Sequence, residues 1–254
     1  MKKSAFSLIA FAAVVLFAAF GVTQTDLSDE ELLTAFDEAR LFDETTTGIT
    51  IAIVAETADD TKEATTRLRF KTIDGEDYAR IEFLAPEELA GQIYLSTPEA
   101  TYFFGPDLDF PIKTSATSEL FGDAAVAQTS GIEFVENYTV VERRDVTLED
   151  GTPAIKVNLE AVDYTVAFQA VTVLADSEKL QPVMMTLYAL SGLPFYKVFF
   201  EAYTTNDEDL YVQTQRIENQ LLIGNRTHLE IVEITTEEFS NELFDPETLT
   251  NTAP

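Results

Sequence analysis

Apolar and polar residues alternate along most of the chain beyond its first fifty residues, and this period of two is typical of strands with one buried face. Ile49, Ile51 and Ile53 alternate with smaller residues, and basic residues alternate with apolar ones in 66–71. The pattern predicts strands at 49–53, 66–71, 78–84, 91–96, 100–104, 137–145, 153–161, 165–174, 182–190, 194–203, 212–222 and 225–235.

Short polar segments separate these strands, for example Asp74-Gly75, Asp150-Gly151 and Gly224-Asn225. Such sequences favour tight reversals between antiparallel strands, so the chain is predicted to form a long antiparallel meander. A sheet of about ten or more twisted strands must curl, split or close. Because the faces of each strand alternate, curling makes one face concave and apolar.

Two helices are expected beside this sheet. Ser28 and Glu31 form a capping box, and Leu32 and Phe36 share one face of a helix that should end near Phe42. The Ala-rich segment from Ser118 to Gln128 indicates a second, short helix. We therefore expect a mainly β fold: a single curled antiparallel sheet, an incomplete barrel of about eleven strands, with an N-terminal helix and a short helical lid over its mouth.

The first residues resemble an export signal. Lys2 and Lys3 precede an apolar run from Ala5 to Phe20, and small residues follow it. This order predicts a secretory signal peptide at residues 1–21 and a single domain at 22–254. The alternative is an uncleaved membrane anchor, because the run has the minimum length for a spanning helix. The sequence has no Cys, which excludes a disulfide and a lipid-modified N-terminus. We expect a soluble, periplasmic product.

Charge narrows the choice of partners. The chain has 45 acidic and 16 basic residues, a net charge of −29, and loss of Lys2 and Lys3 with the leader would leave −31. Such a surface repels phosphate backbones and anionic head groups, so nucleic acid is excluded and contact with lipid has to be apolar. The acids are spread along the chain, which favours a solvated surface adapted to a salty, halophilic environment over an acidic docking face.

Catalytic and metal-binding patterns are weak. The single His228 lies in a predicted strand without a nucleophile motif such as G-x-S-x-G. Asp107 and Asp109 lack the ligand spacing and the turn glycine of a calcium loop. We therefore interpret His228 as a solvent-facing strand residue and the paired acids as turn residues, and we predict neither an enzyme nor a metal or cofactor site.

Aromatic residues are more informative. The chain has 19 Phe and 9 Tyr but no Trp, and many of them lie in predicted strands. Most must fill an ordinary core. Adjacent rings at Phe103-Phe104 and Phe199-Phe200, together with the flexible Met184-Met185 pair, indicate apolar surface beyond that need. We expect an acyl-binding cavity whose wall includes Ile81, Phe83, Tyr94, Tyr102, Phe104, Met184, Leu187, Phe195 and Phe199.

Two segments carry a resemblance to a known family. In 78–95 a strand ends at Pro86, a second strand begins at Gly91, and the aromatic strand 100–104 follows. Residues 238–249 are similar to a short Leu-Phe helix that leads into a last extended piece. Over residues 45–250 the chain resembles the outer-membrane lipoprotein-sorting proteins of the LolA and LolB superfamily.

The resemblance implies an incomplete antiparallel β-barrel whose mouth is plugged by helices and whose apolar cavity shields lipid. The expected function is that of a periplasmic carrier without catalysis, which binds acyl chains of lipoproteins or lipids and moves them toward the outer membrane. A membrane transporter or acceptor protein would load or unload it. The alternative is a structural or adhesive envelope protein whose curled sheet is packed solid.

Overall fold

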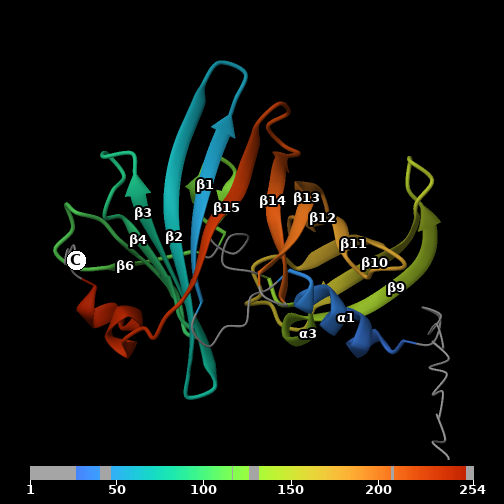
Figure 1. The fold of residues 1–254 in the computed structure, drawn as a ribbon, viewed down its shortest axis with the longest axis horizontal. Coiled ribbons are helices and arrows are strands. Elements are labelled where there is room, and N and C mark those ends of the chain that lie inside the picture. The colour runs from blue at the N-terminus through green and yellow to red at the C-terminus, as the bar shows by residue number, and fades with distance from the viewer. Residues whose placement is uncertain (1–26, 41–46, 116, 126–131, 207–208, 250–254) are drawn as a thin grey trace, which may run out of the picture.

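The structure is a computed structural model, which describes residues 27–40, 47–115, 117–125, 132–206 and 209–249. The predicted signal peptide lies outside the described residues. Most of the described chain belongs to one antiparallel sheet of 13 strands (Figure 1). Its strands are β1 (Thr47–Glu56), β2 (Thr61–Ile73), β3 (Glu76–Ala85), β4 (Ile93–Ser96), β5 (Thr101–Phe104), β6 (Ile112–Thr114), β9 (Tyr138–Thr147), β10 (Pro153–Ala161), β11 (Ala170–Asp176), β12 (Pro182–Tyr188), β13 (Pro194–Asn206), β14 (Asp209–Asn219) and β15 (Arg226–Thr236).

The sheet consists of two meanders rather than one. Its strand order is β6-β5-β4-β3-β2-β1-β15-β14-β13-β12-β11-β10-β9, so the last strand pairs with the first in the middle of the sheet. Gly48 faces Thr235 at one end of this pair, and Glu56 faces Arg226 at the other. The predicted meander is interrupted between β6 and β9, which do not pair with each other. The β1–β15 pairing joins residues far apart in sequence, leaves no local signal and connects the two halves.

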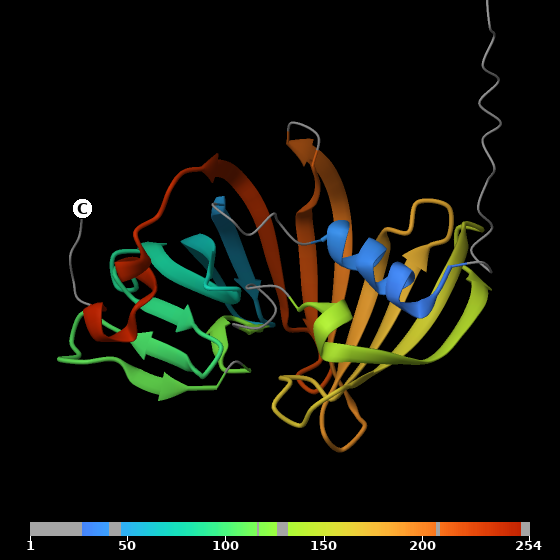
Figure 2. The same cartoon turned by 90° about the horizontal axis from the view of Figure 1, so that it is seen from below.

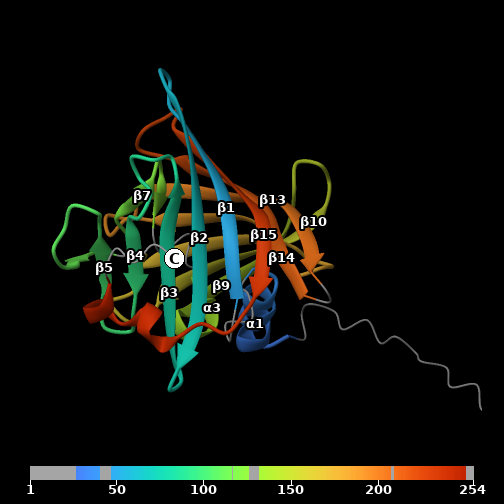
Figure 3. The same cartoon turned by 60° about the vertical axis from the view of Figure 1, so that its left-hand side comes forward.

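The sheet is curled and open. In Figure 3 the upright strands β1, β2 and β3 stand in front of strands from the other half, which run transversely behind them. Accumulated strand twist produces this crossing. The strands β6 and β9 form the two edges and do not pair with each other. The predicted fold class, a curled antiparallel sheet not closed into a barrel, is confirmed, with more strands than predicted.

The N-terminal helix α1 (Asp29–Glu38) lies on the inner face of the β9–β15 half (Figure 2). The predicted capping box forms: the amide of Glu31 donates to Ser28 Oγ at 3.2 Å, and the amide of Ser28 donates to Glu31 Oε2 at 2.8 Å. Leu32, Leu33 and Phe36 are buried in the main core. The helix ends at Glu38, about one turn before the predicted end near Phe42.

The second predicted helix, Ser118 to Gln128, does not form in its described part. Instead, β7 (Glu119–Phe121) and β8 (Ala124–Ala125) make a small hairpin. Gly122 occupies its turn at φ +58, a left-handed conformation that breaks a helix and that other residues rarely adopt. A Cβ at Gly122 would lie 2.4 Å from the Cβ of Ala55. The Gly-Asp turn and this close approach to β1 outweigh the helical preference of the alanines.

One short helix was not predicted. The helix α3 (Phe134–Asn137) directly precedes β9 and lies beside α1. The predicted strand 165–174 also differs, because residues 162–169 form a loop and β11 begins only at Ala170. Phe168 of this loop is buried, so an apolar residue that suggested a strand fills the core from a loop.

Two hydrophobic clusters hold the fold together. The main cluster lies between the concave face, α1, α3 and the β7–β8 hairpin. The second cluster lies on the other side of β4 and β5, beneath two C-terminal 3₁₀ helices, η2 (Asn241–Phe244) and η3 (Pro246–Thr248). Arg80 of β3 reaches this second side, where its Nη1 donates to the carbonyl oxygen of Leu243 at 3.1 Å.

Candidate functional site

A cleft of about 510 Å³ opens on the concave side, between the two halves of the sheet. Its volume falls within the range of about 300–1,000 Å³ that is typical of ligand sites. The β2–β3 hairpin forms one wall, and the segment 132–138 with the β10–β11 loop forms the other. It is lined by Phe70, Lys71, Gly75, Glu76, Asp77, Tyr78, Ala79, Ser96, Thr97, Pro98, Ile132, Glu133, Glu136, Asn137, Tyr138, Thr165, Val166 and Ala167.

The floor of the cleft is apolar and belongs to the main core. Ala79, Ile132 and Tyr138 are buried members of the main cluster, and Phe70 and Val166 pack against it. The hydroxyl of Tyr138 donates to the carbonyl oxygen of Phe168 at 2.8 Å, and burial raises the pKa of this tyrosine. A ligand in this cleft would therefore contact side chains that belong to the same hydrophobic cluster as Leu32, Leu33 and Phe36 of α1.

The rim of the cleft carries charge. Glu76, Asp77, Glu133 and Glu136 contribute carboxylates, and Lys71 is the one Lys or Arg among the lining residues. The Nζ of Lys71 donates to the carbonyl oxygen of Phe239, so the lysine also ties β2 to the segment before η2. An acidic rim around an apolar floor favours a ligand with a neutral or cationic head and an apolar tail.

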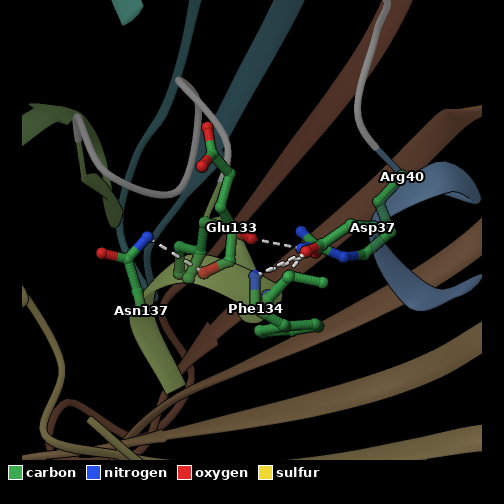
Figure 4. Close-up of polar contacts among 7 residues, drawn as sticks. Asp37, Arg40, Glu133, Phe134 and Asn137 are labelled. Atoms are coloured by element: carbon green, nitrogen blue, oxygen red, sulfur yellow. Dashed lines mark hydrogen bonds and ion pairs between the residues drawn. The ribbon is translucent and has the colours of Figure 1, made fainter. Parts of the chain in front are cut away.

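A buried ion pair fastens α1 beside this cleft (Figure 4). The Nη2 of Arg40, just after the helix, lies 2.8 Å from Asp37 Oδ1. The same nitrogen donates to the carbonyl oxygen of Ile132, and the guanidinium lies 4.2 Å from the centre of the Phe134 ring. The Oδ2 of Asp37 accepts from the amides of Phe134 at 2.8 Å and Val135 at 2.9 Å. We call Arg40, Asp37 and segment 132–135 the latch.

Burial sets the electrostatics of the latch. It raises the pKa of Asp37 despite the opposing effects of Arg40 and the two amides, and it lowers the pKa of Arg40. The Nε of Arg40 is buried without a hydrogen-bond partner among the described residues. An unpaired buried donor costs stability, so the latch is an incompletely satisfied polar contact within an apolar core.

The other end of α1 is held more loosely. The Nη1 of Arg143 on β9 donates to the carbonyl oxygen of Leu27 at 2.8 Å and lies 3.4 Å from Asp29 Oδ1. Both charged side chains are partly exposed. The helix is thus attached to the sheet by one exposed contact, one buried latch and the apolar face between them.

The structure divides the nine predicted cavity residues between different surfaces. Five of them, Ile81, Phe83, Tyr94, Leu187 and Phe195, belong to the main cluster or pack against it. Ile81 and Phe83 are 1% exposed and Leu187 is 0% exposed. These three side chains are therefore packed inside the main cluster and do not line an open cavity among the described residues. None of the nine lines the cleft.

The remaining four lie elsewhere. Tyr102 and Phe104 belong to the second cluster, beneath the C-terminal segment. Met184 pairs with Phe199, and the guanidinium of Arg216 lies 4.1 Å from the centre of the Phe199 ring. Their register places Met184 and Phe199 on the opposite face of their strands from Leu187 and Tyr196.

Sequence reasoning missed the residues that build the cleft and the latch. Asp37 and Arg40 look like ordinary charges at a helix end, and nothing in the sequence shows that Arg40 is buried. Phe70 and Tyr78 fall in predicted strands, but Ile132, on the opposite wall, lies in a segment without a strand pattern. Val166 lies in the part of the predicted strand 165–174 that forms a loop instead. One local signal was available for the latch. The hydrophobic face of the helix ends in an Asp and an Arg three residues apart.

The residues considered above for catalysis or metal binding, His228, Asp107 and Asp109, lie at or near the protein surface. His228 is on β15, partly exposed, with its Nε2 3.7 Å from Glu56 Oε2. Asp107 and Asp109 are exposed. Within the described residues, no group of three or more His, Asp or Glu side chains is arranged to hold a metal ion.

Comparison with solved structures defines the class of fold. A LolA-superfamily protein from Nitrosomonas europaea superposes with a TM-score of 0.77 at 18% identity, over 86% of this chain and 98% of the other. A DUF1329 family protein from Desulfovibrio piger gives 0.73 at 14% identity, over 85% and 95%. A domain assigned as an outer membrane lipoprotein-sorting protein from Vibrio parahaemolyticus gives 0.69 at 16% identity, over 85% and 95%. The chain therefore shares its fold with these three structures.

A family model described as an uncharacterized protein matches residues 75–251, and the chain belongs to that family. A comparison with curated protein sequences found no match. The predicted resemblance to lipoprotein-sorting proteins is confirmed at the level of the fold. Within the described part of the chain, no helix is both long and apolar enough to cross a membrane.

Proposed function

We propose that this protein is a periplasmic carrier that buries acyl chains of lipoproteins or lipids against its concave face and moves them toward the outer membrane. The observation that supports this function best is the cleft, whose floor is continuous with the main core. An acyl chain entering between Tyr78 and Val166 would meet apolar surface at once. Burial of each CH₂ group contributes about 0.8 kcal/mol, so even a few carbons give useful affinity.

Deeper binding requires α1 to move. On the half of the concave face that α1 covers lies Leu187, with Phe195 beside it, whereas Ile81, Phe83 and Tyr94 lie on β3 and β4 of the other half. These five residues are the proposed wall of the enlarged site. The exposed Arg143 contact opens at little cost, whereas the latch is the stronger attachment. In this mechanism cargo replaces the apolar face of α1, and the latch sets how readily it does so.

Export and partners follow from the predicted leader and the charge. Residues 1–21 would direct the chain to the periplasm, where a net charge of −31 keeps it soluble without attraction to anionic lipid. Directional transfer would need a membrane transporter that loads the carrier and an acceptor that unloads it. The chain supplies no chemistry in this scheme, and the acidic surface suits a salty, halophilic habitat.

One observation favours a second candidate. Leu32, Phe36 and Phe134 already fill the concave face, as a solidly packed structural or adhesive envelope protein would require. The two functions differ in one property, since a carrier exchanges its apolar cover for lipid and a structural protein does not. Uptake of an acyl chain therefore separates them.

The experiment is a titration with a fluorescent acyl probe that has a neutral head group, since the rim of the cleft is acidic. It is carried out before and after removal of any lipid retained from the host. We expect saturable uptake, and we expect Ala167→Trp, which fills the cleft, to weaken it while costing about 1–3 kcal/mol of stability. The matched control is Ala52→Trp, because Ala52 lies on β1 between the core residues Ile51 and Ile53 and points away from them. A wild-type protein that takes up no probe in either state would remove the carrier and leave the structural candidate.

A further inference from the structure

Exposed apolar side chains gather on three loops of the β9–β15 half. Of the twelve large apolar side chains that are exposed in the described residues, seven lie in 162–169, 189–193 and 220–225. The most exposed member of each loop is Tyr164 at 86%, Leu190 at 89% and Ile223 at 94%. Monomeric proteins rarely gather so much exposed apolar surface without a partner for it.

The three loops are neighbours along one end of the sheet. They join β10 to β11, β12 to β13 and β14 to β15, and alternate turns of an antiparallel meander fall at the same end. Ala170 pairs with Tyr188, and Tyr196 pairs with Asn219, so the loops lie next to one another. Strands are about 4.8 Å apart, which places the first and third loops roughly 20 Å apart. In Figure 2 these loops (yellow, orange and dark orange) lie together at the lower centre.

The third loop is held in its exposed position by buried polar contacts. The Oδ1 of Asn219 accepts from the amides of Leu221 at 2.9 Å and Leu222 at 2.8 Å. The Nδ2 of the same residue donates to Asp123 Oδ1 at 2.7 Å, and Asn219 is only 5% exposed. A buried side chain thus orders a loop whose apolar residues face outward, which argues that their exposure is a built feature of the fold.

These loops are also nearly uncharged in a strongly acidic protein. Asp163 is the one charged residue in 162–169, 189–193 and 220–225, although the chain carries a net charge of −29. By contrast, the turns at the other end of the same strands contain Glu149, Asp150, Glu178 and Lys179. A second copy of this chain would bring its own −29 to the contact, and this repulsion opposes self-association.

We propose that the three loops, 162–169, 189–193 and 220–225, form an edge that inserts into the surface of a lipid bilayer. A row of projecting loops fits a deformable lipid surface better than it fits a rigid groove on a protein. Tyr164 has an apolar ring and a polar hydroxyl, and tyrosine is a residue type found at the membrane–water interface. The neutral edge lets the acidic body approach lipid without bringing its charge close. The inference is independent of cargo, because an edge of this kind docks equally well on a filled sheet.

The test uses the protein as its cell processes it and vesicles of phosphatidylcholine. Since the chain has no Trp, Ile223→Trp supplies a unique reporter in the third loop. We expect its emission to shift to the blue on vesicle binding and to be quenched by brominated lipid. Val232→Trp is the matched control, an exposed residue on the body of β15, and its emission should stay unchanged and unquenched.

Removal of the apolar tips provides the second measurement. Ile223→Asp combined with Leu190→Asp should weaken vesicle partitioning about a hundredfold or more, because each large apolar side chain returned to water accounts for about a factor of ten. Val232→Asp should leave it unchanged. Added phosphatidylglycerol should weaken binding, and salt should restore it. A quenched Val232→Trp, partitioning unaffected by the double change, or a dimer that the double change dissolves would overturn the proposal.

Discussion

The latch between α1 and segment 132–135 permits a prediction with a worked magnitude. Arg40→Met keeps most of the apolar stem but removes the 2.8 Å ion pair with Asp37, the bond to the Ile132 carbonyl and the contact with the Phe134 ring. Asp37 would then be a largely buried carboxylate that keeps its two amide hydrogen bonds but has no counter-charge. Breaking a buried pair in this way costs about 3–5 kcal/mol, which is a large part of the stability of a typical domain.

Asp37→Asn is the second single variant of a double-mutant cycle with Arg40→Met. The amide can still accept from the Phe134 backbone, but it leaves Arg40 without its counter-charge, and we expect a loss of about 1–3 kcal/mol. The double variant carries neither buried charge, so it should be more stable than the sum of the two single losses predicts, by about 1–3 kcal/mol. The assay is urea unfolding followed by circular dichroism, with the slope checked for two-state behaviour.

Arg143→Met serves as the control, because Arg143 holds the other end of α1 through a partly exposed pair with Asp29. Its cost should stay below about 1 kcal/mol. If Arg40→Met also cost less than about 1 kcal/mol, the burial argument for the latch would be refuted. Under the proposed function, Arg40→Met should in addition take up the neutral fluorescent acyl probe faster than wild type, because α1 separates from the sheet more easily.

Four further outcomes are expected. Gly122→Ala should lower stability by about 1–3 kcal/mol in urea unfolding, because φ is +58 and the new Cβ would meet the Cβ of Ala55. Burial raises the pKa of Asp37, so the folded protein binds a proton at this carboxylate more readily than the unfolded chain does. Wild type should therefore gain stability relative to Asp37→Asn as the pH falls from about 6 toward about 4. A gain in relative stability as the pH rises would contradict this prediction. With a net charge of −29, the melting temperature should rise between about 0.01 and 1 M sodium chloride; a flat curve would mean that the acids are already paired. N-terminal sequencing of exported protein should start near Val22, and an intact Met1 in a membrane fraction would contradict the predicted leader.

Local patterns predicted most of the strands because alternation and turn chemistry act within a few residues. The twelve predicted strands all correspond to observed ones, and the capping box at Ser28 forms as predicted. Pairings between distant segments were not predictable in this way. The β1–β15 contact and the position of segment 132–138 beside β2 and β3 depend on the curl of the whole sheet.

The candidate site shows the same limit in its register. Tyr94 and Tyr102 both lie in aromatic strands, but Tyr102 pairs with Leu95, so the two tyrosines point to opposite faces. A shift of one residue in pairing exchanges the faces, and a single sequence does not fix that register. The burial of Arg40 was missed for another reason. A charged residue is almost never fully buried without a partner, and the sequence did not show that segment 132–135 would lie against it.

The central pairing of β1 with β15 also has a consequence for how the protein is made. Strands β2 to β6 can begin to pair as they emerge, but one edge of β1, with Ile49, Ile51 and Ile53, stays bare until the last strand of the sheet has been synthesised and released. A long apolar strand with an open edge is a template for pairing with other chains. Closure across so much of the sequence is also intrinsically slow. If the predicted leader exports the chain before it folds, a chaperone would be needed most during this waiting time.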